Sequence, residues 1–456
     1  MSTPLVADAI GRYHELLAGA FDPKGWWTHH RDEVLRHWHD EAPLEAFVLR
    51  PLMIDEATYA GTLASVAQVM RGFAIAADRL AADEPLRRAM GIPTYMEPLL
   101  ELDRANGKPT TLGRVDGLMG ADGRLTLIEF NSEPQSAPFQ YELERSFAKL
   151  PITAELEKSF RVRTIDPYAQ MYDTLRARGR EGRMPCIAIV DKALWRSHRR
   201  ASIFRPLMYC SARGCPVLYV DPEELDYRNG KLTANGIDVD LVAFPNWELV
   251  INARKRLVKI LKAVAEGAVE VFAGLSRGLL ASYKTVFELL SSPAYRDMFP
   301  AEVNAALAQH IPWTRVLRER KTDRAGGEVD LLPFVAAHRE QLVIKPAGGG
   351  GGGNIHVGRD LTDDAWTAAI QKGVAQNWIV QELAIPERQS FPVADLDGNI
   401  GFHELNCEFT PYVWNGVRVE GVLCRVVAGS VISDLGDRKI GIHNGVETAT
   451  WIIDRR

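Results

Sequence analysis

Residues Leu342–Gly358 read LVIKPAGGGGGGNIHVG, and this stretch decides how the chain folds. Six consecutive glycines stand between two apolar, β-branched runs, and Lys345 and a proline come shortly before them. A flexible linker would need polar, structureless flanks. The flanks QLVIKP and NIHVGR instead predict that the glycines join two paired strands.

The absence of side chains in this run suits a loop that touches a ligand. Backbone N–H groups can approach the ligand closely, and the loop can close over it. A Walker-type loop needs Gly-Lys-Ser/Thr at its exit, and a Rossmann loop opens a helix in a βαβ unit. The run leaves through Asn354-Ile355, so both motifs are absent. Two interpretations remain: a hairpin covering nucleotide phosphates, with Lys345 aimed at the same charge, and a loose hairpin without a ligand.

A second hairpin is predicted in GRVDGLMGADGRLTLIEFNSEP, which begins at Gly113. Arg114 and Asp116 lie two residues apart and so share one face of a strand, as do Glu129 and Asn131 after the Ala-Asp-Gly turn. Asp116, Glu129 and Asn131 can converge as hard oxygen ligands, a set that suits Mg²⁺. The alternative is a hairpin with a salt bridge between Arg114 and Glu129.

Composition limits the class of protein. The chain has 456 residues, which indicates two or three domains, with 46% hydrophobic and 25% charged residues. A net charge of −5 argues against sequence-independent binding of nucleic acid. We expect a soluble, cytoplasmic protein, because no apolar run reaches membrane-spanning length and no signal peptide is evident. The five cysteines lack CxxC spacing and are expected to be buried, reduced thiols: Cys186, Cys210, Cys215, Cys407 and Cys424.

Hydrophobic patterning predicts an α+β fold with an α/β lobe, in four regions. Residues 1–110 are expected to be mainly helical, and residues 111–179 hold the carboxylate hairpin. Residues 180–278 alternate short β-rich runs with helical segments, as in a small parallel α/β domain. Residues 279–456 are expected to form a mostly antiparallel domain around the glycine run.

Together these motifs resemble the ATP-grasp ligases. The resemblance rests on R-x-D…E-x-N, on the lysine-ended strand before the glycines, and on the apolar strand ending in Gln381-Glu382-Leu383. In that family the lysine strand comes first in the chain, and here the order is reversed. The reversal resembles the circularly permuted ATP-grasp enzymes related to glutathionylspermidine synthase. LLASYKTVFELLSS resembles their segment with a first phosphate-contacting lysine, here Lys284. The likeness covers about residues 110–456.

The resemblance implies a role for each matching residue, with ATP and Mg²⁺ as cofactors. It implies that Asp116, Glu129 and Asn131 bind magnesium and that Lys284 and Lys345 contact the phosphates. The loop that covers the phosphates would consist of Gly348, Gly349, Gly350, Gly351, Gly352 and Gly353, and the adenine hinge of Gln381, Glu382 and Leu383. Arg114 would steady the transferred phosphoryl group, and Arg425 would assist. Six consecutive glycines are more than this loop usually contains in the family, where glycine is mixed with other residues. A second E-x-N, Glu404 and Asn406, competes for the metal role and ranks second, because its counterpart in the permuted group is a structural strand.

The implied activity is ATP- and Mg²⁺-dependent ligation of a carboxylate to an amine through an acyl phosphate, with release of ADP. The substrates would be small molecules or short peptides, with no nucleic acid or membrane involved. A phosphotransferase and a non-catalytic nucleotide-binding protein are the alternatives. Asp116 and Lys345, far apart in the chain, are predicted to face one cleft, with residues 180–278 forming a lobe beside it. Asp116 and Glu129 are expected to be exposed site residues. The acid, the amine, the role of the N-terminal region and the oligomeric state stay open.

Overall fold

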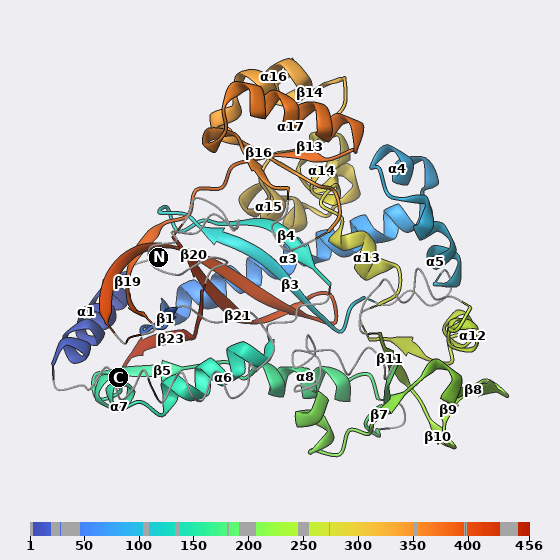
Figure 1. The fold of residues 1–456 in the computed structure, drawn as a ribbon, viewed down its shortest axis with the longest axis horizontal. Coiled ribbons are helices and arrows are strands. Elements are labelled where there is room, and N and C mark those ends of the chain that lie inside the picture. Colours follow the sequence, from blue (N-terminus) through green and yellow to red (C-terminus); the bar gives the residue numbers. More distant parts are fainter. Residues whose placement is uncertain are drawn as a thin grey trace.

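The described part of the chain forms six sheets in a computed structural model: a central antiparallel sheet of seven strands, an antiparallel and a parallel sheet of four strands each, and three sheets of two or three strands (Figure 1). The structure describes residues 3–19, 28, 46–103, 109–132, 137–179, 182–190, 207–244, 255–272, 274–349, 354–395, 397, 399–428 and 446–456.

The central sheet has seven strands, and every pairing in it is antiparallel. Its strands are β1 (Ala46–Val48), β3 (Leu112–Met119), β4 (Leu125–Asn131), β19 (Arg388–Asp395), β20 (Ile400–Trp414), β21 (Arg418–Val427) and β22 (Val446–Thr448). The long strand β20 pairs with β19 along its first half and with β3 along its second. The predicted hairpin is confirmed as β3 and β4, with Asp116 opposite Glu129 and Arg114 opposite Asn131.

The helix α3 (Glu56–Ala82) crosses behind this sheet and forms much of the main core (Figure 1). The Asp55 side chain accepts a hydrogen bond from Thr58 N–H and so caps its N-terminus. By length and composition α3 could cross a membrane, which the sequence patterning had not predicted. Its buried side chains pack in a protein core instead. Its helical neighbours are α4 (Glu84–Ala89), α13 (Arg277–Ser282), α14 (Val286–Ser291) and α15 (Ala301–His310). Three further short helices are η1 (Thr94–Met96), α5 (Glu97–Leu102) and η3 (Pro293–Met298).

The first hundred residues are less purely helical than the patterning predicts. They add β1 to the edge of the central sheet, and β2 (Leu52–Asp55) pairs in parallel with β23 (Thr450–Arg455) near the chain's end. These two ends of the chain are therefore held together by backbone hydrogen bonds. The elements around this junction are α1 (Pro4–Ala18), α6 (Ala137–Ala148), α7 (Pro151–Leu156), β5 (Phe160–Arg163) and α8 (Pro167–Arg176).

A four-stranded antiparallel sheet, at the top of Figure 1, carries the glycine run. Its order is β13 (Thr314–Val316), β18 (Ile379–Glu382), β16 (Leu342–Lys345) and β17 (His356–Val357). The predicted pairing of the two flanks of the glycines is thus confirmed. One face of the sheet packs on α16 (Leu331–Ala337) and α17 (Asp363–Ala375) in a separate core. Beside it lie β14 (Lys321–Arg324), β15 (Gly327–Asp330), η4 (Arg339–Gln341) and η5 (Gly358–Asp360).

The remaining lobe, at the lower right of Figure 1, contains the predicted parallel unit. Its parallel strands are β6 (Ile187–Val190), β7 (Val217–Val220), β11 (Leu241–Ala243) and β12 (Glu270–Val271). Its other elements are η2 (Pro222–Glu224), β8 (Leu225–Arg228), β9 (Lys231–Ala234), β10 (Ile237–Asp238) and α12 (Val258–Ala265). The five cysteines are all buried free thiols, as expected.

Candidate active site

A cavity of about 780 Å³ opens where the carboxylate hairpin, the segment between α13 and α14, and the start of the glycine run meet. Its lining includes Glu129 of the predicted hairpin, Gly348 and Gly349 of the glycine run, and Lys284, which the family resemblance had pointed to. Cavities of this size hold nucleotides and other small molecules. The hairpin is fixed to this wall by Ser132 N–H, which donates to Ser282 Oγ at 3.2 Å.

Lys284 lies in the short connection between α13 and α14 and is 5% exposed. Its Nζ donates to Glu129 Oε1 at 2.8 Å and to the Gly349 carbonyl at 2.9 Å. Its backbone N–H also donates to the Ala347 carbonyl at 2.8 Å. One lysine therefore joins the hairpin of the central sheet to the loop of the small sheet.

The glycine loop is described only at its beginning, since Gly350, Gly351, Gly352 and Gly353 lie outside the described residues. A Cβ added to Gly348 would meet the Tyr283 ring at 3.1 Å, and Gly349 has a φ of +88°. Both positions therefore favour glycine. The covering role of the loop stays a prediction.

Lys345 ends β16 with its side chain buried on the face of the small sheet that looks toward the main core. Its Nζ donates to Gln381 Oε1 at 2.9 Å, and Gln381 Nε2 donates to Thr314 Oγ1 at 3.0 Å. The side-chain amide of Gln381 thus orients the lysine and is itself held in place.

Burial, with a smaller contribution from the charge of Lys284, lowers the pKa of Lys345 to about 8. The carboxylates of Glu129 and Asp116 act in the opposite direction. Interactions between charges weaken with distance, so these four side chains belong to one electrostatic environment. Asp116 and Lys345 are both absent from the cavity lining that the structure describes, so their facing each other across one cleft stays a prediction.

Asp116 is held by two neighbours on its own hairpin. Arg114 donates Nε to Oδ1 at 2.8 Å and Nη2 to Oδ2 at 3.1 Å, and Asn131 Nδ2 donates to Oδ2 at 3.1 Å. The salt bridge considered for the hairpin therefore joins Arg114 to Asp116, while Glu129 pairs with Lys284. Asp116 is 5% exposed, so the expectation of an exposed side chain is wrong for it. Packing of the β20 strand alongside β3 is the physical reason.

Glu408 is the site neighbour that the sequence analysis missed. It lies on β20 opposite Arg425 of β21, is 1% exposed, and its Oε2 accepts from Arg425 Nε at 2.6 Å. Burial, with a smaller contribution from the Asp116 carboxylate, raises the pKa of Glu408 to about 7 against the opposing effect of Arg425. Oε1 has no hydrogen-bond partner among the described residues. Two charged residues inside the apolar runs CEFTPYV and VLCRVV were the available signal.

The competing E-x-N lies earlier on the same strand. Asn406 is buried, whereas the Glu404 side chain is exposed. The backbone carbonyl of Glu404 accepts a hydrogen bond from Arg388 Nη2 at 2.5 Å. Among the residues that the structure describes, neither Glu404 nor Asn406 lines the cavity.

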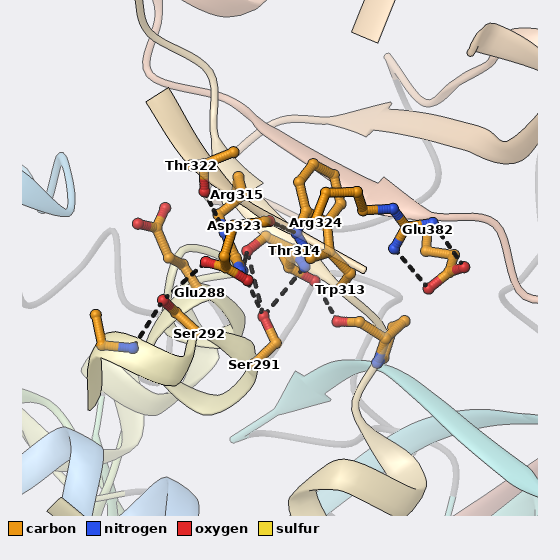
Figure 2. Close-up of polar contacts among 12 residues, drawn as sticks. Glu288, Ser291, Ser292, Trp313, Thr314, Arg315, Thr322, Asp323, Arg324 and Glu382 are labelled. Atoms are coloured by element: carbon orange, nitrogen blue, oxygen red, sulfur yellow. Dashed lines mark hydrogen bonds and ion pairs between the residues drawn. The ribbon is translucent and has the colours of Figure 1, made fainter. Parts of the chain in front are cut away.

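The predicted adenine hinge ends β18. Glu382 N–H donates to the Trp313 carbonyl, and Leu383 N–H donates to the Gln341 carbonyl, each at 2.8 Å. Figure 2 shows the Glu382 carboxylate paired with Arg324, at 3.1 Å from Nη2, with Arg324 beside the Trp313 ring. Residues 381–383 are absent from the cavity lining that the structure describes, so the hinge role stays a prediction.

Comparison with known proteins supports the fold. No protein-family model and no curated protein matches this sequence. A glutathione synthetase-like effector from Globodera pallida, solved in its apo form, is 10% identical with a TM-score of 0.58, over 95% of this chain and 98% of that one. The two chains therefore share a mixed helix-and-sheet fold along nearly their whole length.

Two further solved structures are less similar to this chain. A putative γ-glutamylcysteine synthetase from Methylobacillus flagellatus is 12% identical, over 90% of each chain, with a TM-score of 0.39. A RimK domain protein of ATP-grasp type from Sphaerobacter thermophilus is 13% identical, over 58% of this chain and 89% of that one, with a TM-score of 0.23. The circular permutation stays a prediction.

Proposed function

We propose that this protein is an ATP- and Mg²⁺-dependent carboxylate–amine ligase of the permuted ATP-grasp type, which forms an amide and releases ADP and phosphate. One observation carries the proposal: Lys284 bonds both Glu129 of the carboxylate hairpin and Gly349 of the glycine run, at the wall of a 780 Å³ cavity. Lys284, Glu129 and the start of the glycine loop line this cavity, and the charges of Lys345 and Asp116 act in the same electrostatic environment, an arrangement suited to transfer of a phosphoryl group.

In this proposal, the chain's residues act mainly by position and charge. Lys284 and Lys345 neutralise the phosphates, and Gly348 and Gly349 begin the loop that covers them. Both lysines are buried, so their charges act in a poorly solvated environment where they stabilise an anion strongly. Arg114 pairs with Asp116 of the hairpin and steadies the phosphoryl group as it passes to the acid. Arg425 on β21, held by Glu408 of the intervening strand β20, assists.

The donor set fits a magnesium ion that is shared with a nucleotide. Asp116 and Glu129 face each other across the β3–β4 pairing, and Asn131 adds an amide oxygen. Among the described residues, no cluster of three His, Cys, Asp or Glu side chains makes a metal cage by itself. Mg²⁺ commonly takes only one or two carboxylates and completes its shell with phosphate oxygens and water. When bound, the ion would neutralise charge on the β- and γ-phosphates.

Product analysis tests the proposal directly. The full chain would be incubated with labelled ATP, Mg²⁺ and a panel of carboxylic acids and amines, and the nucleotide and organic products would be separated. We expect ADP and phosphate in equal amounts with an amide, and no turnover in Lys284→Met. Stoichiometric AMP would indicate adenylation and overturn the mechanism. A stable phosphorylated product would identify a phosphotransferase, and failure to bind ATP would remove the proposal.

A further inference from the structure

The N-terminal region forms one wall of the candidate active site. Gly91, Pro93 and Tyr95, between α4 and α5, line the same cavity as Lys284 and Gly349. The hydroxyl of Tyr95 hydrogen-bonds the hydroxyl of Tyr283, the residue before Lys284. Tyr95 keeps 41% of its surface exposed, although it is a large aromatic side chain. A partly exposed ring at the wall of a charged cavity is available to a ligand.

This wall is built to stay in place. Gly91 has a φ of +66°, and a Cβ there would lie 2.9 Å from the Asn377 Cβ, so glycine allows the segment to pack closely on the small sheet. Arg318 Nη1 donates to the Ala89 carbonyl at 2.9 Å and ties the same two parts together. The buried Arg87 side chain binds Glu97 through two nitrogens, at 2.9 and 2.6 Å, and so closes the loop that carries Tyr95.

The lining of the cavity combines charged and aromatic side chains. Lys284 and Glu129 supply the charges, while Tyr95, Tyr283 and Trp378 supply the rings. Trp378 is 5% exposed; the His356 ring stacks on it with centroids 5.7 Å apart, and the Lys372 ammonium lies 4.7 Å from its ring centroid. Such a lining complements an anion that carries a flat or apolar ring.

Trp378 lies at the opposite end of β18 from the predicted adenine hinge. Trp378 immediately precedes the strand and Leu383 immediately follows it. At roughly 3.3 Å per residue, the five steps between them span about 16 Å. A triphosphate reaching from the hinge past Lys345 would therefore leave its transferable end, not its base, near the rings.

We infer that Tyr95 and Trp378 bind the ring of the carboxylic acid substrate, with its carboxylate directed toward Lys284 and the transferred phosphoryl group. The inference rests on the proposed function and names its substrate class: a monocarboxylic acid with an aromatic or alicyclic ring. The acid oxygen would attack the γ-phosphorus of ATP, the bond from that phosphorus to the bridging oxygen would break, and ADP would leave with the electron pair. Tyr95 is then a specificity-determining residue contributed by the N-terminal region.

Two binding measurements on the full chain test this inference. Calorimetry would measure the affinity for AMP-PNP with Mg²⁺, and equilibrium dialysis in the presence of AMP-PNP would measure binding of acetate, cyclohexylacetate, phenylacetate and indole-3-acetate. We expect the ring-bearing acids to bind better than acetate. Tyr95→Ala should weaken phenylacetate binding about tenfold, the effect of losing one aromatic contact and its burial, and leave acetate and AMP-PNP unchanged. Tyr95→Phe should keep most of the preference.

A matched control is Tyr172→Ala, a partly buried tyrosine on α8 that does not line the cavity and should change no affinity. Equal binding of acetate and the ring-bearing acids would overturn the inference while leaving the proposed function intact. Loss of AMP-PNP affinity in Tyr95→Ala, with acid binding unchanged, would place the nucleotide base at this wall and also overturn it. Failure of the wild-type chain to bind AMP-PNP would instead remove the proposed function.

Discussion

Replacing Lys345 by methionine should separate stability from function, because the lysine is almost completely buried and its charge is poorly solvated. Burial lowers the pKa of Lys345 from 10.5 to about 8. The unfolded chain therefore binds this proton more tightly, and below pH 8 the folded state carries the full cost of the buried ammonium. That cost is about 3 kcal/mol, from roughly 1.4 kcal/mol per unit of pKa.

Lys345→Met removes this cost at pH 7 but leaves Gln381 Oε1 without its donor, which costs about 1–3 kcal/mol. The expected net change in the free energy of unfolding lies between about 0 and +2 kcal/mol in favour of the variant. The wild-type protein should also gain stability as the pH rises from 8 toward 10.5, whereas the variant lacks this gain. Affinity for AMP-PNP should fall about tenfold or more, since a charged hydrogen bond to phosphate is worth about 1.5–3 kcal/mol.

Urea unfolding at pH 7 and pH 9, together with calorimetry of AMP-PNP binding, measures all three effects. Lys158→Met is the control, because Lys158 is an exposed partner of Glu155 and should shift neither stability nor affinity appreciably. A variant destabilised by more than about 1 kcal/mol at pH 7 would show that the buried Lys345 ammonium does not lower the free energy of unfolding of the wild-type protein. A variant that binds AMP-PNP as tightly as the wild type would show that Lys345 does not serve the nucleotide.

Asp116→Asn should weaken Mg²⁺-dependent AMP-PNP binding and lower the free energy of unfolding by about 2 kcal/mol, because a buried arginine loses its counter-charge. Glu404→Ala should change neither quantity in the same two assays, and the reverse ranking would mean that the other Glu-x-Asn is the metal strand. Glu408→Ala should lower the rate of ADP release with little change in nucleotide affinity, while Glu408→Gln still accepts a hydrogen bond from Arg425 and restores the rate; no rescue would contradict a positioning role. Burial raises the pKa of Glu144 from 4.5 to about 8, so wild-type stability should fall as the pH rises from 5 to 9, and Glu144→Gln should lack this fall in urea titrations; parallel profiles would refute the buried-acid assignment.

Local pattern was enough to predict the elements that carry the candidate site. The period of two in RVDGLM and RLTLIEF predicts a hairpin, and the register places Asp116 opposite Glu129 as the pattern requires. The apolar flanks of the glycines predict paired strands, and β16 and β17 pair. Both results follow from burial and turn chemistry within a short stretch of chain, and the local order of residues is enough to predict them.

Pairings between distant segments could not be predicted in this way. The strands β1 and β2 are three and four residues long, too short for a periodic signal, and their partners lie near the other end of the chain. Charged residues in apolar strands, such as Glu408 and Arg425, were visible in the sequence. Nothing local, however, indicated that the two would face each other.

The sequence by itself determined which residue types face inward on each strand, where the glycines bend the chain, and that carboxylates and lysines are present for phosphate chemistry. Only the tertiary structure decided that Lys284 meets Glu129, that Asp116 is buried, and that Tyr95 completes the cavity wall. Hydrophobic periodicity reports whether a side chain is buried, whereas its partner depends on how separate sheets and helices pack. That packing is settled by the free energy of the whole core, which no single segment contains.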